Sequence, residues 1–265
     1  MLRVRNPSLD PQKKKEHPFI DVPCGKCAEC LSQRRRQWVL RLKLEYQYCT
    51  SCFAVTLTYD DEHLAENASL CKRHVQLFMK RLRHYNIGEK PIKYFIVGEY
   101  GDKLGRPHYH AIFFNLVCED IKKAFDNCWT YGFYKFGDNK GPAFAYTAKY
   151  YIKQFDAEYY ADLMLSKPFT LVSKGIGSSY LTDENIRFHE DNDYCIISTF
   201  DGQNAFMPKY LRNKIWTNPL NQKNVVQQNF TYLVKKGIIN LSDAPNRALA
   251  LNNRFDSIQR KLHHK

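Results

Sequence analysis

Apolar positions along the first half of the chain repeat with two periods, which predict its helices and strands. From Leu31 to Tyr46 they return every three to four residues, as on one face of a helix, with basic residues between them. Residues 53–59 combine β-branched and aromatic side chains, which favour a strand. Ser69 can cap a second helix. The inward face of that helix is expected to consist of four apolar residues: Val75, Phe78, Leu82 and Tyr85.

Two strands, residues 92–99 and 108–114, are expected next, followed by a helix at 119–129 and a strand at 131–136. The order β-α-β-β-α-β is that of the split βαβ arrangement, a ferredoxin- or RRM-like α+β fold. It predicts an antiparallel sheet, here called the palm, with both helices on one face and the other face free for a ligand. Residues 142–165 predict a further helix, rich in Tyr and Lys.

The rest of the chain is expected to form a smaller mixed region that packs on the palm. Residues 168–177 and 194–206 suit short strands, the second turning at Asp201-Gly202. Three helices are expected, at 208–216, 220–236 and 245–262, and the last residues are expected to be partly mobile. The chain thus divides into residues 1–50 (a loosely held basic arm over 1–22, a cysteine cluster and an arginine-rich helix), 51–165 (the palm and tyrosine helix) and 166–265.

The composition indicates a folded, basic protein. Hydrophobic residues make up 44% and aromatic residues 14% of the 265, which excludes a wholly disordered or fibrous chain. The 40 Lys and Arg against 27 Asp and Glu give a formal net charge of +13. Interleaved with 18 Tyr and 17 Phe, this charge favours single-stranded nucleic acid as partner, because bases stack on rings while cations follow phosphates. A basic surface that serves solubility is the alternative.

Several classes of protein are not expected. No stretch approaches the ~20 apolar residues that span a membrane, and the N-terminal residues lack the apolar core of a signal peptide. Nine cysteines, an odd number, do not indicate a disulfide framework, so a reducing cytoplasm is the expected location. The chain has no Gly-x₄-Gly-Lys-Ser/Thr loop, and therefore neither a fused helicase nor a nucleotide cofactor is expected.

The segment Arg106-Pro-His-Tyr-His110 carries the strongest chemical signal. His108 and His110 are two apart on a strand and share a face. Glu99 falls on the same face of the neighbouring antiparallel strand, and pairing it with His108 fits a connection of eight residues, 100–107. Two imidazoles and one carboxylate are the ligands of a divalent metal site that leaves positions open for substrate. A histidine pair on a wet sheet face is the alternative.

A tyrosine pair follows on the predicted helix. Tyr146 and Tyr150 are four residues apart and share one helix face, with Lys149 and Lys153 on or beside it. A phenol becomes a useful nucleophile towards a phosphate that a metal ion has polarised, and ammonium groups can hold that phosphate. In isolation such a pair more often serves packing.

Taken together, Glu99, His108-Tyr-His110 and Tyr146-Thr-Ala-Lys149-Tyr150 resemble the HUH endonuclease superfamily. More narrowly, the chain is similar to the replication initiation proteins of the microviruses, most of all those of the gokushovirus branch. The resemblance covers residues 20–215. Further matching motifs are Pro23-Cys-Gly-Lys-Cys-Ala-Glu-Cys30, Thr56-Leu-Thr-Tyr59, Gly98-Glu-Tyr-Gly101 and, more weakly, Lys174-Gly-Ile-Gly177 and Asp201-Gly202 through Pro208-Lys-Tyr210.

The resemblance implies a rolling-circle replication initiator that nicks and joins single-stranded phage origin DNA. Glu99, His108 and His110 would hold Mg²⁺ or Mn²⁺, Tyr146 and Tyr150 would be alternating nucleophiles that form a 5′-phosphotyrosine link, and Lys149 would steady the phosphate. A host helicase and a host polymerase become expected partners, in the host bacterial cytoplasm. A relaxase or transposase of the same type, and a non-catalytic single-stranded nucleic-acid-binding module on the same sheet, are the alternatives.

The cysteines near the N-terminus suggest a second metal. Cys24, Cys27 and Cys30 are spaced as in a zinc knuckle, with three reduced thiols in a turn as the alternative. Cys49 and Cys52 cannot join them if one helix separates the two groups. The basic residues expected to bind DNA are Arg34, Arg35, Arg36, Lys153 and Arg106; for the Arg34–Arg36 run, a solvated helix face is the alternative.

Overall fold

The protein is described from a computed structural model, which defines residues 2–5, 12, 15, 19–22, 24–25, 27–65, 67–101, 104–137, 141–150 and 157–235. The chain divides into two compact units. The larger unit is Gln37–Ile239, and the N-terminal residues up to Arg36 belong to the other. The helix predicted at 245–262 lies outside the described residues, as do residues 151–156 of the helix predicted at 142–165.

In the smaller unit, β1 (Leu2–Arg5) and β2 (Phe19–Val22) form an antiparallel pair, with Leu2 opposite Val22. The expectation of a loosely held arm is therefore wrong for these eight residues. Leu2 and Val4 alternate with arginines, which is the period of a strand. Helix α2 (Ala28–Tyr48) begins in this unit and ends in the larger one.

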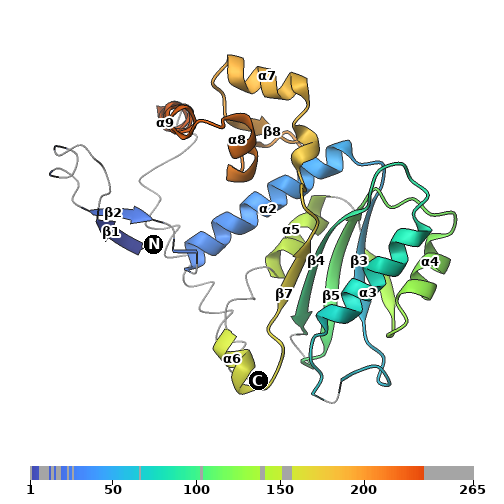
Figure 1. The fold of residues 1–265 in the computed structure, drawn as a ribbon. Coiled ribbons are helices and arrows are strands. Elements are labelled where there is room, and N and C mark those ends of the chain that lie inside the picture. Colours follow the sequence, from blue (N-terminus) through green and yellow to red (C-terminus); the bar gives the residue numbers. More distant parts are fainter. Residues whose placement is uncertain are drawn as a thin grey trace. The chain divides into compact units, whose positions relative to one another are not determined.

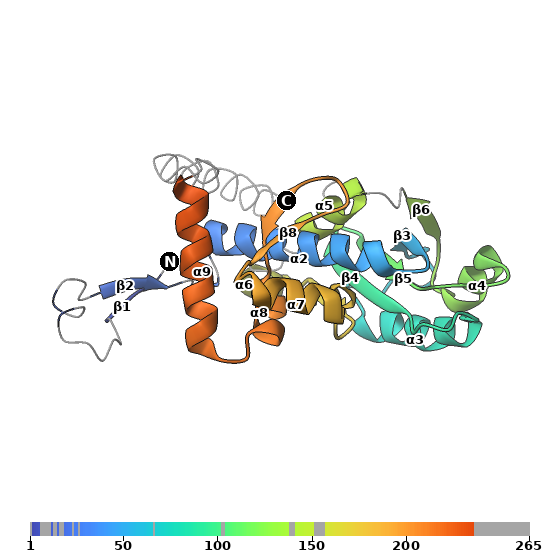
Figure 2. The same cartoon turned by 90° about the horizontal axis from the view of Figure 1, so that it is seen from above.

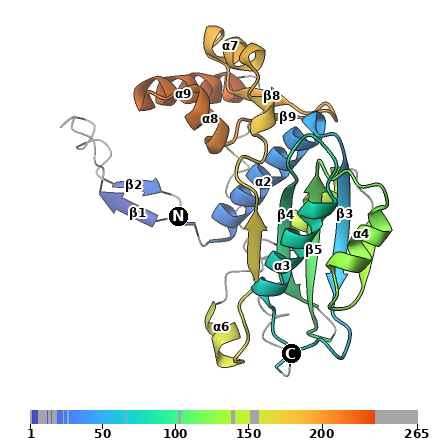
Figure 3. The ribbon, with the colours of Figure 1, turned by 45° about the vertical axis from the view of Figure 1, so that its right-hand side comes forward.

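The larger unit is built on a five-stranded antiparallel sheet. The strands β3 (Cys52–Thr58), β4 (Lys93–Tyr100), β5 (Pro107–Phe114) and β6 (Tyr134–Gly137) lie in the order β6-β3-β5-β4, as the split βαβ arrangement requires. The α+β palm is thus confirmed. Strand β7 (Phe169–Val172), predicted as part of residues 168–177, adds to the edge of β4 (Figure 3).

The first face of the sheet carries the main core. Helices α3 (Lys72–Leu82) and α4 (Ile121–Cys128), with the 3₁₀ turn η1 (Arg83–Tyr85) after α3, cover it (Figure 1). Asp120 caps α4 by accepting hydrogen bonds from two backbone N–H groups. Ser69 does not cap α3, which begins after Cys71; its hydroxyl instead accepts the N–H of Ser166.

The second face is not free, so that expectation is wrong. Helix α5 (Gly141–Tyr150) and the Gln37–Tyr48 part of α2 pack on it (Figure 1). The cluster beneath them is apolar, because Phe95, Ile112 and Phe114 point to this face and need cover. Only the end of the face that carries the predicted metal ligands remains for a substrate.

The C-terminal part of the unit packs on the other side of α2, as Figure 2 shows for α7 and α8. It contains α6 (Ala157–Asp162), η3 (Ser178–Tyr180), α7 (Asp183–Asp191), β8 (Ile196–Ser198), β9 (Asn204–Phe206), α8 (Lys209–Ile215) and α9 (Pro219–Lys235). The β8–β9 hairpin turns at Asp201-Gly202 as predicted, with Gly202 at φ +74°. Residues 163–165 follow α6 as a turn rather than continuing a helix. Among the described residues no helix is long and apolar enough to cross a membrane.

Candidate metal centre and tyrosine helix

The predicted metal ligands meet on the second face of the sheet. Glu99 of β4 pairs directly with His108 of β5, the register that the strand period predicted. Oε1 of Glu99 lies 3.0 Å from Nε2 of His108 and 3.2 Å from Nε2 of His110. One ligand atom from each residue lies within 4.8 Å of the others. Glu99 is 3% exposed, so its carboxylate is buried between the two rings.

Each imidazole is oriented by its other nitrogen. Nδ1 of His108 lies 3.1 Å from the carbonyl oxygen of Arg106, and Nδ1 of His110 lies 3.3 Å from Oγ1 of Thr56. A carbonyl can only accept, so Nδ1 of His108 carries the proton. Its Nε2 then faces a carboxylate oxygen, which is favourable only if a proton or a metal ion lies between them. The residues therefore fit a divalent cation held by two imidazoles and one carboxylate.

Helix α5 brings both tyrosines to this centre, in different ways. The Tyr150 ring stacks on His110 with centroids 4.3 Å apart and planes at 5°. Tyr150 is 6% exposed, whereas Tyr146 is 52% exposed, with its ring 5.5 Å from His110 and 5.1 Å from Tyr150. Lys149 is half-buried in the last turn of the helix. Tyr146 is the phenol that a substrate can reach in this conformation.

A pocket opens beside the centre. It has a volume of about 360 Å³ and lies between β3, β5 and α5. His110, Tyr146, Thr56 and Thr147 line it together with small apolar residues, among them Ala143. Its floor is apolar with a few hydroxyl groups, which is the lining that a flat heteroaromatic ring prefers.

Tyr109, between the two histidines, belongs to the opposite face. Its hydroxyl lies 2.8 Å from that of Tyr59 and accepts the N–H of Cys71, where α3 starts. Burial, chiefly, raises the pKa of Tyr109 to about 12, and that of Tyr59 is raised as well. Both phenols stay protonated at neutral pH and anchor the helix rather than react.

The remaining predicted residues fall in several places. The Arg106 guanidinium donates to Asp61 Oδ1 (2.6 Å) and to the carbonyl of Tyr59, so it fixes the end of β3. Lys153 lies outside the described residues. Arg34 and Arg36 are exposed on α2 in the smaller unit, and Arg35 is half-buried there.

Sequence reasoning missed Thr56 as a member of the site. The residue lies opposite His110 in the β3–β5 register, and its hydroxyl orients that ring. The signal that could have found it was the Thr56-Leu-Thr-Tyr59 motif, because a hydroxyl at the same parity as the histidines points to the same face.

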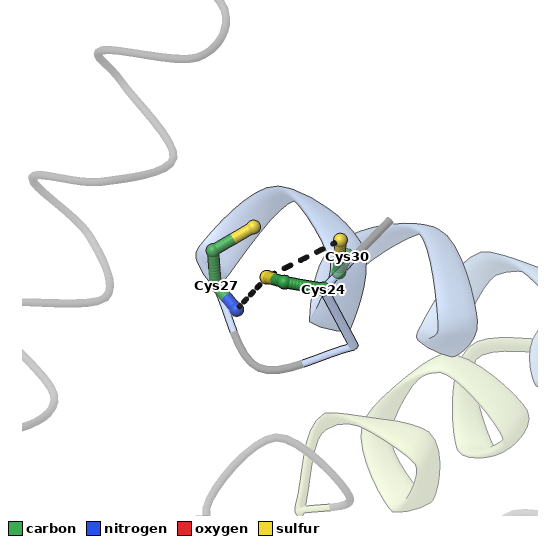
Figure 4. A group of neighbouring side chains, drawn as sticks. All are labelled: Cys24, Cys27 and Cys30. Carbon is green, nitrogen blue, oxygen red and sulfur yellow. Dashed lines mark hydrogen bonds between the residues drawn. The ribbon is translucent and has the colours of Figure 1, made fainter. Parts of the chain in front are cut away.

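The thiols of Cys24, Cys27 and Cys30 also converge (Figure 4), and one sulfur from each lies within 4.8 Å of the others. Cys49 and Cys52 are not part of this group, as predicted, because α2 runs unbroken from Ala28 to Tyr48.

Comparison with known proteins identifies relatives among phage proteins. The family model of the ORF2-type replication-associated proteins matches residues 52–155. Replication-associated protein ORF2 of Spiroplasma virus 4 is 35% identical over 216 residues, which cover 73% of this chain and 67% of that protein. Replication-associated protein VP4 of Bdellovibrio phage phiMH2K is 34% identical over 160 residues, 53% of this chain and 50% of that protein.

Replication-associated protein ORF4 of Chlamydia phage 1 is 43% identical over 96 residues, 35% of this chain and 24% of that protein. No solved structure matches. The matched region of the family model contains the palm, the metal ligands and the tyrosine helix. The chain belongs to the replication-associated protein family of these small phages.

Proposed function

We propose that this phage replication protein is a metal-dependent nickase and strand-joining enzyme of the HUH type, which starts rolling-circle replication at the single-stranded origin. The observation that carries the proposal is the position of Tyr146, an exposed phenol whose ring lies 5.5 Å from that of His110. A nucleophile beside two imidazoles and a carboxylate is the arrangement that phosphoryl transfer to a side chain needs.

Glu99, His108 and His110 would hold Mg²⁺ or Mn²⁺. Such an ion, when bound, polarises the scissile phosphate and offsets the charge that develops on it. Tyr146 Oη attacks the phosphorus and the bond from phosphorus to the 3′ oxygen breaks. The phenol proton leaves to solvent, and the departing oxygen takes up a proton to become a 3′-OH. The product is a 5′-phosphotyrosine, whose link conserves the energy needed for rejoining, so no nucleotide cofactor is required.

Tyr150 is the second nucleophile in this proposal, and Lys149 steadies the phosphate from the same helix. Because Tyr150 is buried against His110, it acts after Tyr146 and has to leave that stack first. The pocket beside Tyr146 takes a base that flanks the scissile phosphate, which aligns the strand for attack. Host helicase and polymerase, in the host cytoplasm, would supply strand separation and synthesis.

The test is a covalent adduct. Single-stranded oligonucleotides that tile the genome encoding the chain are labelled at the 5′ or the 3′ end and incubated with the protein and Mn²⁺. With the cleaved oligonucleotide, the 3′ label is expected to migrate with the protein in SDS, and the 5′ label to appear in a shorter product with a 3′-OH. Chelation of the metal prevents both.

Matched variants separate the parts of the proposal. Tyr146→Phe combined with Tyr150→Phe is expected to abolish the adduct and leave DNA binding intact, whereas Tyr232→Phe, on the surface of α9, changes nothing. An adduct that persists in the double variant overturns the tyrosine assignment. Full nicking by His108→Ala/His110→Ala overturns the metal assignment. Tight DNA binding without any cleavage by the unaltered protein favours the non-catalytic module.

A further inference from the structure

A turn before α2 gathers three thiols that the proposed nicking reaction does not use. Sγ of Cys24 lies 3.9 Å from Sγ of Cys30, and Cys27 is close to both (Figure 4). Cys30 is buried, whereas Cys24 and Cys27 are half-buried, so one side of the group is open. All nine cysteines of the chain lie among the described residues, and none of them forms a disulfide.

The sulfur spacing suits a tetrahedral metal ion. A disulfide has sulfurs ~2.0 Å apart, and 3.9 Å is far too long for one. With Zn–S bonds of ~2.3 Å, two sulfurs at tetrahedral positions lie about 3.8 Å apart. The Cys24–Cys30 distance therefore corresponds to one edge of a zinc–thiolate tetrahedron.

The backbone of the turn is shaped around the sulfurs. Gly25 adopts φ +75°, a left-handed conformation that glycine adopts without strain. The turn lets the N–H of Cys27 donate to Sγ of Cys24 (3.2 Å), and the carbonyl of Cys27 accepts the N–H of Leu31 in the helix. An N–H aimed at sulfur stabilises a thiolate, which is the form that binds metal.

Positive charge lies beside the group. An ideal Cβ on Gly25 would be 3.3 Å from Nη2 of Arg34, so this guanidinium lies against the turn. The first turn of α2 contributes the positive end of the helix dipole. Three thiolates around one divalent ion carry a net negative charge, and both features offset it.

We propose that Cys24, Cys27 and Cys30 bind one Zn²⁺ ion as thiolates. Binding releases the three thiol protons and involves no change of oxidation state. The fourth position, on the open side, takes a water molecule or a donor from outside the described residues. The ion fixes the turn from which the Arg34–Arg36 segment of α2 starts.

The proposal is tested on the full chain, purified without added metal under reducing conditions. Elemental analysis is expected to find about one zinc per chain. Cys27→Ser/Cys30→Ser is expected to remove it, while Cys118→Ser, a half-buried thiol of the larger unit, retains it. His108→Ala/His110→Ala also retains it, so that failure of the zinc site and failure of the nicking proposal are distinguishable.

Two further measurements report on the thiols themselves. Replacement by Co²⁺ is expected to give sulfur-to-metal charge-transfer absorption, which an ion on Glu99, His108 and His110 cannot produce. Alkylation followed by mass spectrometry is expected to show Cys24, Cys27 and Cys30 protected until a strong chelator is added. Zinc content that is unchanged in the double cysteine variant overturns the proposal. So does a chain that takes up no zinc, or one that instead carries iron and sulfide.

Discussion

His110 is held from three sides, and each contact has a different role. Thr56 orients its Nδ1, Glu99 lies at its Nε2, and the Tyr150 ring covers its face. A ring so constrained can ligate a metal ion in one orientation only. The hydroxyl of Thr56 therefore acts through the histidine, as a positioning group.

We predict that Thr56→Val lowers the affinity for Mn²⁺ by about tenfold, because a hydrogen bond that orients a metal ligand typically contributes that much. Valine keeps the shape of the side chain and removes the hydroxyl, so the strand is preserved. Titration calorimetry with Mn²⁺ measures the effect, and Thr231→Val on α9 is the matched control. An unchanged affinity would remove Thr56 from the site.

At this scale the sequence predicted the ligands well and the tyrosines incompletely. Glu99, His108 and His110 follow from a period of two and a short connection, both of which are local. That Tyr150 is buried while Tyr146 is exposed depends on how α5 packs over β5, which residues distant in the chain decide.

Among the elements, α2 shows why the rest was harder to predict. Its Leu31–Tyr46 stripe indicated one buried face, yet within the larger unit the helix buries two: Leu42 lies in the cluster under the sheet, and Leu40 and Leu44 in the C-terminal cluster. Polar residues between them are buried as well. Lys43 pairs with Asp201 (2.6 Å), and Glu45 is 1% exposed. A hydropathy pattern does not reveal such pairs, because the partners are distant in the sequence.

Glu45 gives a prediction for this element. Its carboxylate accepts from Lys93 Nζ (2.7 Å), from the N–H of Gly177 (2.8 Å) and from Ser179 Oγ (2.9 Å), so it joins α2, β4 and the segment after β7. Glu45→Ala is expected to lower the free energy of unfolding by about 3 kcal/mol or more, because a largely buried ammonium loses its partner. Glu45→Gln keeps two acceptor contacts and should cost less. Urea unfolding measures both, and equal losses would contradict the charge argument.

Helix α7 supplies a prediction on pH. His189 is fully buried between Tyr180, whose hydroxyl lies 2.7 Å from Nε2, and the carbonyl of Tyr194, next to Nδ1. Burial lowers the pKa of His189 below 6.5, and burial raises that of Tyr180 to about 12, so the neutral ring accepts from a protonated phenol.

The unfolded chain therefore binds a proton in acid more readily than the folded one at this position. Its contribution to stability is complete above pH 6.5 and is lost as the pH falls below that value towards the folded pKa. His74, whose pKa is also lowered by burial, adds to the same range. We expect the free energy of unfolding to fall between about pH 6.5 and 5, and less steeply in His189→Asn. An identical pH dependence in the variant would contradict the assignment.

For the whole molecule, the net charge of +13 sets the affinity for a polyanion, but charge alone does not say where the strand binds. Arg34 and Arg36 are exposed on α2 beside the cysteine turn, whereas Lys122 and Lys123 are exposed on α4, which covers the first face of the sheet. The metal centre lies on the second face. The two pairs carry equal charge in different places and can be compared directly.

We predict that Arg34→Ala/Arg36→Ala makes the binding of an oligo-dT strand less dependent on salt. The slope of log K against log[salt] is expected to become shallower by roughly 1.4, about 0.7 for each phosphate that the protein no longer neutralises. Lys122→Ala/Lys123→Ala should leave the slope unchanged while removing the same charge. Fluorescence anisotropy across a salt series, with chelator present to prevent cleavage, measures both. If the two variants shift the slope equally, the net charge rather than the arginines of α2 governs binding, and the strand does not follow that helix.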